Sequence, residues 1–154
     1  MKKILFVCTA NICRSPMAQM VATQVIERKG LARLVEVGSA GTHASSGAQP
    51  DGRARTALEK RGYKIGKGKS RRIGPGDFER FDLILAMDRS NLKSLQDGCP
   101  AHCLPKLKLF LQLPSLQNLD EVPDPYYGNA EGFERVLDLC EAGVDKILAD
   151  LDLR

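Results

Sequence analysis

Residues 3–16 read KILFVCTANICRSP, and this stretch decides the fold. Residues 3–8 are a nearly continuous apolar run of strand length, and a helical periodicity begins after Pro16. Ser15 and Pro16 are helix-start signals, because a serine hydroxyl can cap free N–H groups and proline at the first helical position lacks one. Residues 9–14 are therefore expected to form a short bend between a strand and a helix.

The rest of the chain repeats this alternation of strand and helix. We predict strands over 34–39 and 81–88, and the consecutive apolar residues 83–87 are typical of a buried central strand. Lysine alternates with leucine over 105–111, which predicts an edge strand with one partly wet face. Together with residues 3–8, these segments make four strands.

Three more helices are predicted. Asp51 caps one that reaches about Arg61, a second covers 89–97, and Asn129 caps the last. An apolar stripe at spacings of three and four marks the last helix: Phe133, Val136, Leu137, Cys140, Val144, Ile147, Leu148 and Leu151. The pattern predicts an α/β fold, a doubly wound four-stranded parallel sheet flanked by helices on both faces.

Length and composition indicate one ordinary globular domain over 1–154, with 43% hydrophobic and 27% charged residues. The opening MKKILFVC imitates a secretory leader, but its apolar run Ile4–Val7 is shorter than the ~7 to 15 residues of a leader. Five cysteines without regular spacing fit free thiols in a reducing compartment. We therefore expect a cytoplasmic protein with no membrane span.

The net charge of +4 is mild, and much of the basic excess lies in KIGKGKSRR, residues 64–72. This segment is either a solvated loop or a site of attraction for an anionic partner. It contains no aromatic residue, so we expect no nucleic-acid binding. The GKS at 68–70 is not a nucleotide-binding loop, because Tyr63 stands where that motif requires glycine.

The bend carries the chemistry. In parallel sheets ligands bind at the carboxyl ends of strands, and Cys8 ends the first strand. Backbone N–H groups and the helix dipole would form an anion site there and favour a thiolate at Cys8. Arg14 can hold two oxygens of a phosphate. A zinc site is disfavoured by the spacing of five between Cys8 and Cys13 and by a total of two histidines.

Three motifs in order, CTANICRSP (8–16), FDLILAMDRSNL (81–92) and VPDPYYG (122–128), resemble the low-molecular-weight protein tyrosine phosphatase family. The resemblance covers essentially the whole chain. It implies a flavodoxin-like four-stranded parallel sheet and a phosphotyrosine phosphatase that uses no metal or cofactor. It also implies that Cys8 attacks phosphorus, Arg14 binds the phosphoryl group, and Asp124 acts as general acid and base.

The resemblance assigns further residues to substrate and phosphate binding. Tyr126 and Tyr127 would wall the slot for the phosphoaryl group. Asn11 would hold the loop through a positive φ, which asparagine tolerates, and Ser15 would donate a hydrogen bond to the Cys8 thiolate. The full phosphate-binding set is Thr9, Ala10, Asn11, Ile12, Cys13 and Ser15.

Two positions of the loop raise questions of their own. Most relatives have glycine where this chain has Ala10, and alanine would cost on the order of 1 kcal/mol if the loop requires positive φ there. Cys13 is either a resolving partner that forms a reversible disulfide with Cys8, as in some relatives, or a small residue packed beneath the loop.

Other functions remain as alternatives. Arsenate reduction coupled to thioredoxin would need relay cysteines, and Cys99 and Cys103 suggest it, although structural or incidental roles are favoured over a relay or a metal clip. Phosphoarginine hydrolysis is disfavoured by Ile12, whose apolar side chain suits an aromatic ring better than a guanidinium. A non-enzymatic phosphate or RNA binder is the last alternative. The partners expected are phosphotyrosine-containing proteins and a cognate tyrosine kinase.

Overall fold

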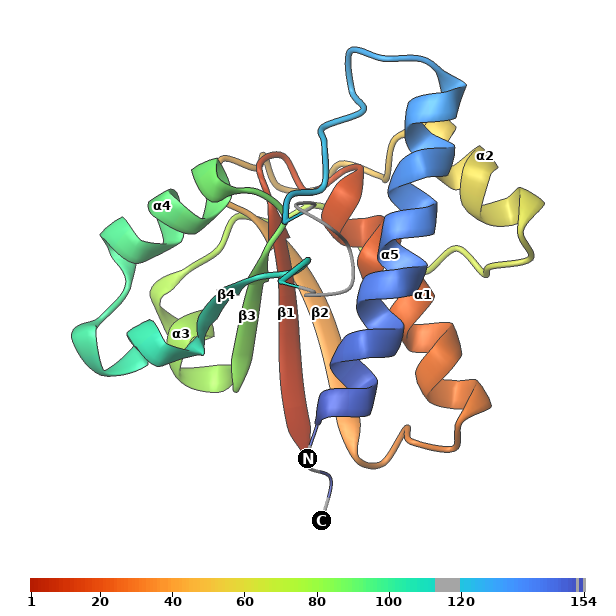
Figure 1. Ribbon diagram of the computed structural model, residues 1–154. Coiled ribbons are helices and arrows are strands. Elements are labelled where there is room, and N and C mark those ends of the chain that lie inside the picture. Colours follow the sequence, from red (N-terminus) through yellow and green to blue (C-terminus); the bar gives the residue numbers. More distant parts are fainter. Residues whose placement is uncertain (113–119, 152, 154) are drawn as a thin grey trace.

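A computed structural model of the chain describes residues 1–112, 120–151 and 153 (Figure 1). Four strands form one sheet in the order β2-β1-β3-β4, and every neighbouring pair is parallel. The strands are β1 (Lys2–Cys8), β2 (Val35–Gly41), β3 (Leu83–Ala86) and β4 (Leu107–Leu109). The two apolar runs form the central strands β1 and β3, so the predicted four-stranded parallel sheet is confirmed.

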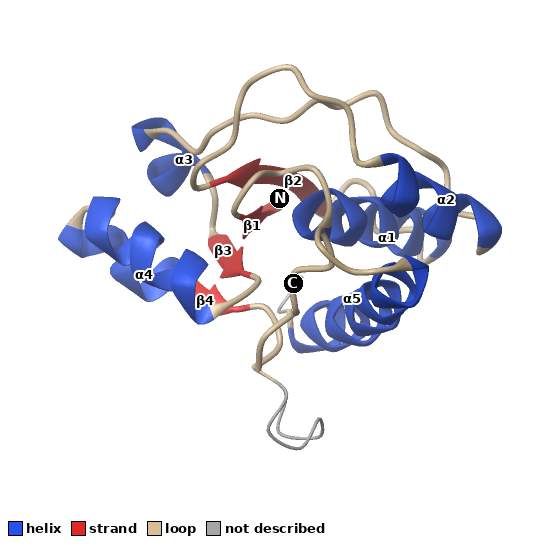
Figure 2. Cartoon of the chain, turned by 90° about the horizontal axis from the view of Figure 1, so that it is seen from above, coloured by secondary structure: helices blue, strands red, loops and turns tan. Residues whose placement is uncertain are grey.

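Helices cover both faces of this sheet, as predicted. Figure 2 shows α1, α2 and α5 on one side and α3 and α4 on the other. Their bounds are α1 (Arg14–Arg28), α2 (Gly52–Lys60), α3 (Pro75–Arg80), α4 (Arg89–Gly98) and α5 (Ala130–Asp150), with a 3-10 helix η1 (Ala101–Lys106) before β4.

Strand β1 divides the core in two because its side chains alternate between the faces of the sheet. Phe6 and Cys8 belong to the apolar cluster that includes residues of α1, α2 and α5. Leu5 and Val7 belong to a second cluster with residues of α3, α4 and η1. The last residue of β1 therefore presents its thiol on the face covered by α1 and α5.

The start of α1 differs from the prediction. Arg14 is the first helical residue and Cys13 is the N-cap, without a side-chain capping bond. Pro16 is therefore the third helical residue, and the prediction that Ser15 caps this helix was wrong. The reason is local: the Ser15 hydroxyl lies against Cys8 and Asn11 inside the bend.

The edge strand was predicted too long, and two short elements were missed. Residues 105 and 106 end η1, and Pro105 lacks the N–H that a strand ladder needs, so β4 begins at Leu107. Helix α3 and η1 have six residues each. Elements this short contain too few turns to show a periodic apolar stripe.

Helix α5 packs against α1 through the predicted stripe, and Asn129 caps it by accepting a hydrogen bond from the Gly132 N–H at 3.3 Å. Gly143 is required by a close approach: a Cβ there would lie 2.5 Å from the ring of Phe110. Among the described residues, no helix is both long and apolar enough to cross a bilayer.

Candidate active site

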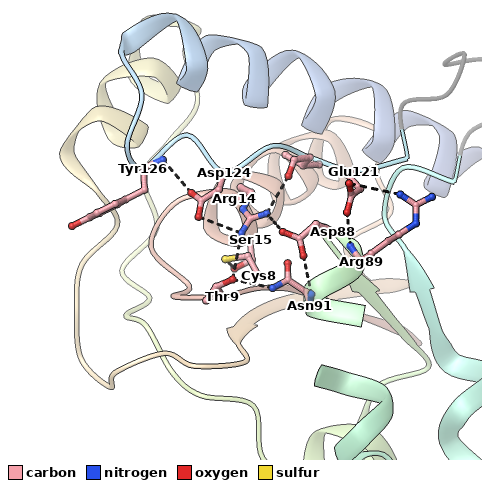
Figure 3. A network of polar contacts seen from close by, with 11 residues as sticks. Cys8, Thr9, Arg14, Ser15, Asp88, Arg89, Asn91, Glu121, Asp124 and Tyr126 are labelled. Carbon is pink, nitrogen blue, oxygen red and sulfur yellow. Dashed lines mark hydrogen bonds and ion pairs between the residues drawn. The ribbon is translucent and has the colours of Figure 1, made fainter. Parts of the chain in front are cut away.

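The bend between β1 and α1 lies at the carboxyl edge of the sheet, and Figure 3 shows the polar network around it. Cys8 is 3% exposed, and its Sγ lies 3.0 Å from the Ser15 Oγ. The Ser15 Oγ also accepts a hydrogen bond from the Asn11 side chain at 2.8 Å. The Ser15 Oγ can also donate to the Ala40 carbonyl at 3.4 Å, so two acceptors, that carbonyl and the sulfur of Cys8, lie within reach of its single proton.

Asn11 holds the bend in shape. Within the described part of the chain it is the one non-glycine residue with positive φ, at 58°, as predicted. Its amide also donates to the Ser39 Oγ at 3.0 Å on β2, and its Oδ1 accepts the backbone N–H of Arg71 at 3.0 Å. One side chain thus joins the bend to α1, to β2 and to the segment before α3.

The backbone N–H groups of the bend are free. Among the described residues, none of the N–H groups of residues 10–13 donates a hydrogen bond to another part of the protein, although the carbonyls of Thr9, Ile12 and Cys13 accept bonds from elsewhere. Ala10 has no positive φ, so alanine is not strained there. The cost considered for alanine at a positive φ therefore does not arise at this position.

Arg14 is buried, with 2% of its side chain exposed. Its Nη1 donates to the Asp88 carboxylate at 2.6 Å and to the Val122 carbonyl at 3.0 Å. Its Nη2 lies 3.5 Å from the Thr9 Oγ1, inside the bend. A buried guanidinium with one nitrogen anchored and the other aimed into the bend can bind an anion without reorganising.

Asp88 and Asn91 complete the support for Arg14. The Asp88 carboxylate accepts the Asn91 backbone N–H at 2.8 Å, and the Asn91 side chain donates to the Thr9 Oγ1 at 3.0 Å. Both residues lie in the motif FDLILAMDRSNL (81–92), but no role was predicted for either of them. Their position directly after a central strand was the available signal.

Asp124, from a segment far along the sequence, also approaches the Arg14 guanidinium. Its Oδ2 lies 3.6 Å from the Arg14 Nη2, and its Oδ1 accepts the Tyr126 backbone N–H at 3.1 Å. The side chain is 49% exposed, in contrast to the 2% of Arg14. Figure 3 shows the Cys8 thiol, the Arg14 guanidinium and the Asp124 carboxylate close together at this edge of the sheet.

The comparisons with known proteins agree with this geometry. The family model described as low molecular weight phosphotyrosine protein phosphatase matches residues 3–154. This chain belongs to that family. The family prediction is therefore confirmed, as is the enzyme class, because members of the family are phosphatases and hence hydrolases.

Individual relatives of this phosphatase cover almost its whole length. A Synechocystis protein named in this family is 42% identical over 97% of the chain and 96% of its own length. A low molecular weight protein-tyrosine-phosphatase of Streptomyces coelicolor is 39% identical over 96% and 92%. A crystal structure of an Entamoeba histolytica protein tyrosine phosphatase with Hepes in its active site superposes with a TM-score of 0.91, at 38% identity over 97% and 96%.

The two tyrosines after Asp124 lie at the surface. Their rings meet edge to face with centroids 5.0 Å apart. Tyr126 is 42% exposed and Tyr127 is 94% exposed. Figure 3 shows the Tyr126 ring pointing away from Cys8, and Tyr127 is almost entirely in solvent, so the slot wall implied by the resemblance stays a prediction.

Arg53, on α2, was missed by the sequence analysis and holds the segment that carries Asp124. It donates to the Tyr126 carbonyl at 2.9 Å and to the Gly128 carbonyl at 3.3 Å. Asp51 accepts hydrogen bonds from the Arg53 side chain, which lower the pKa of the Asp51 carboxyl. The backbone N–H of Asp51 in turn donates to the Ile12 carbonyl at 2.8 Å, so α2 ties this segment to the bend.

Cys13 and Ile12 are the residues of the loop that pack against the core. Cys13 is 4% exposed and free, and burial, helped by the nearby Asp51, raises the pKa of its thiol to about 12. Ile12 is half-buried and packs against the α1 and α5 cluster. Cys13 is therefore protonated at neutral pH, which suits either a packed residue or a thiol that acts only after Cys8 is oxidised.

Proposed function

We propose that this phosphatase hydrolyses phosphotyrosine side chains of proteins through a phosphocysteine at Cys8. One observation carries the proposal: the Arg14 Nη2 lies within 3.6 Å of both the Thr9 hydroxyl and the Asp124 carboxylate. The same guanidinium therefore contacts the phosphate-binding bend and the general acid. The bend provides free backbone N–H groups for the phosphate. The Hepes bound in the Entamoeba histolytica active site, whose sulfonate resembles phosphate in shape, supports an oxyanion site.

The chemistry takes two steps. In the first, the Cys8 thiolate forms a bond to phosphorus, the bond to the tyrosyl oxygen breaks, and Asp124 donates its proton to that oxygen. In the second, Asp124 takes a proton from water, which attacks phosphorus and breaks the bond to sulfur. Arg14 and the loop N–H groups bind the phosphoryl oxygens in both steps, and the Ser15 hydroxyl stabilises Cys8 as the leaving thiolate.

The alternatives on the same fold fit less well. Relay cysteines for arsenate would have to approach Cys8, but Cys99 and Cys103 pack with the apolar cluster on the opposite face of the sheet. For phosphoarginine, a guanidinium beside Ile12 would lie against an apolar side chain that offers no hydrogen-bond partner. The exposed rings of Tyr126 and Tyr127, in the segment that carries Asp124, are available to pack against the ring of a phosphotyrosine.

The cellular setting forms part of this proposal. All five cysteines are free. Free thiols persist best in a reducing compartment, which supports the cytoplasm as the location of this protein. Its partners would then be phosphotyrosine proteins and the tyrosine kinase that makes them.

Trapping the intermediate tests the mechanism. The protein is mixed with a phosphotyrosyl peptide, quenched in acid within milliseconds, digested and analysed by mass spectrometry. We expect one phosphoryl group on the peptide that contains Cys8, in the presence of a metal chelator. A phosphoryl group on any other residue would contradict the assignment of the nucleophile.

Substrate choice is tested separately. Phosphotyrosyl and phosphoarginyl peptides of the same sequence are compared by kcat/KM, and arsenate is added with thioredoxin as the reductant. We expect the phosphotyrosyl peptide to be the best substrate and arsenate not to be reduced. A higher kcat/KM for the phosphoarginyl peptide would show that phosphoarginine is the substrate, and it would not contradict the role of Cys8 as the nucleophile.

A further inference from the structure

Three side chains able to bind a metal ion meet away from the active site. Glu79 comes from α3, and His102 and Cys103 come from η1. One ligand atom from each lies within 4.8 Å of the other two, and the His102 Nε2 is 2.7 Å from the Glu79 Oε1. Cys103 packs on the face of the sheet opposite to Cys8, so this cluster is separate from the catalytic thiol.

The burial of the three groups suits a site that an ion can enter. Cys103 is fully buried, while the side chains of Glu79 and His102 are 61% and 69% exposed. The thiol forms the floor and the two exposed groups form the rim. Because Cys103 has no exposed surface, an ion reaches the sulfur only when the exposed Glu79 and His102 side chains separate and give up their hydrogen bond.

Some of the surrounding charges favour a bound cation and others oppose it. Helix α3 ends at Arg80, and its last carbonyls, which favour a cation, point toward η1. The Lys106 Nζ already binds two of them, from Phe78 at 2.6 Å and Glu79 at 3.3 Å. This ammonium group repels a second cation and limits the affinity of the cluster.

We propose that Glu79, His102 and Cys103 form a binding site for Zn²⁺ or a similar transition-metal dication. The donor set of carboxylate oxygen, imidazole nitrogen and thiolate sulfur suits zinc or cobalt and is unsuited to Mg²⁺ or Ca²⁺. Three protein ligands leave a fourth tetrahedral position for water. Binding releases the Cys103 thiol proton to the buffer, changes no oxidation state, and links α3 to η1.

The sulfur ligand is assigned to Cys103 rather than to Cys99. Both cysteines lie in CPAHC, and their spacing alone does not distinguish them. The Cys99 Sγ instead donates to the Pro100 carbonyl at 3.3 Å and does not belong to the cluster of ligand atoms. Cys99 is therefore a matched control for Cys103.

Cobalt titration tests the site, because thiolate binding to Co²⁺ gives a sulfur-to-metal charge-transfer absorption. The full-length Cys8→Ser protein is used, so that the catalytic thiol cannot compete. We expect binding of one Co²⁺ with this absorption, displacement by Zn²⁺, and a rise in Tm with Zn²⁺. Glu79→Gln, His102→Gln and Cys103→Ser should each weaken binding at least about tenfold.

Two further variants serve as controls: Cys99→Ser and His43→Gln should keep both the absorption and the affinity. Absence of one-to-one binding, or binding unchanged by Glu79→Gln and His102→Gln, would overturn the proposal. Loss of the absorption in Cys99→Ser or Cys13→Ser, with retention in Cys103→Ser, would also overturn it. Glu79 and His102 are exposed, so their variants give the answer even if Cys103→Ser fails to fold.

Discussion

The two halves of the catalytic apparatus are held in different ways. The bend at residues 8–15 is supported from within, since Cys8, Asn11, Arg14 and Ser15 are all at most 4% exposed and hydrogen-bonded to one another or to buried neighbours. The segment with Asp124 lies at the surface and is attached through Arg14 and Arg53. A nucleophile and its cradle need a fixed geometry, whereas an acid must also exchange protons with water.

The largest effect is expected from Cys8→Ser. Serine keeps the shape of the buried cradle but is a far weaker nucleophile at neutral pH, so turnover of an aryl phosphate should fall to background. Cys99→Ser is the control and should keep wild-type turnover. Phosphate binding to Cys8→Ser, measured by calorimetry, should persist because Arg14 and the loop remain. Turnover like that of the wild type would contradict the mechanism.

Asp124→Asn should have the next largest effect and should break only the acid half. We expect kcat/KM to fall on the order of 10²- to 10⁴-fold for phenyl phosphate, whose leaving group needs a proton. The loss should be much smaller for an activated nitrophenyl phosphate. Asp120→Asn is the matched control, because that carboxylate lies in the same segment and pairs with Arg89. Equal losses on both substrates would argue against a general acid.

Arg53→Gln tests whether the acid segment depends on its anchor. Glutamine cannot bridge the Tyr126 and Gly128 carbonyls to Asp51, so Asp124 should be less well placed. We expect a loss of about tenfold in kcat/KM for phenyl phosphate and a smaller loss for the nitrophenyl ester. Arg55→Gln is the matched control, because Arg55 contacts Gln49 and not the Asp124 segment. It should leave kcat/KM unchanged for both substrates. A drop in Tm with no dependence on leaving group would show that Arg53 is merely structural.

Cys13→Ser should leave turnover close to that of the wild type and change the response to peroxide. If Cys13 resolves oxidised Cys8, the wild-type protein should form a disulfide between them and regain activity with a thiol reductant, whereas the variant should lose activity irreversibly. Mass spectrometry after mild oxidation distinguishes the two forms. Overoxidised Cys8 beside an unmodified Cys13 in the wild-type protein would support the packing role instead.

The smallest effect is expected from Ala10→Gly. Because Ala10 has no positive φ, glycine relieves no strain and only adds freedom to the unfolded chain, at a cost of about 0.4–1 kcal/mol. The Tm should fall slightly and kcat/KM should stay unchanged. A clear rise in kcat/KM would show that alanine restrains the phosphate loop.

The elements that were predicted well are those with a strong local pattern. The strands β1 and β3 are visible in the sequence because burial on two faces leaves a continuous apolar run, and α5 is visible because burial on one face leaves a periodic stripe. Helix α3 and η1 were missed because six residues give no such record. Ser15 was misassigned as a cap, since a hydroxyl at a helix start can satisfy either the backbone or a neighbouring thiol.

The sequence by itself determined the chain order of the four strands and the longer helices, and it placed Cys8 and Arg14 on one short bend whose shape depends on near neighbours. The tertiary structure alone decided which distant groups join them. Asp124 and Asp88 reach Arg14, and Glu79 reaches His102, from segments that only sheet order and helix packing bring together. Contacts of that range depend on the packing of the whole chain and leave no local pattern.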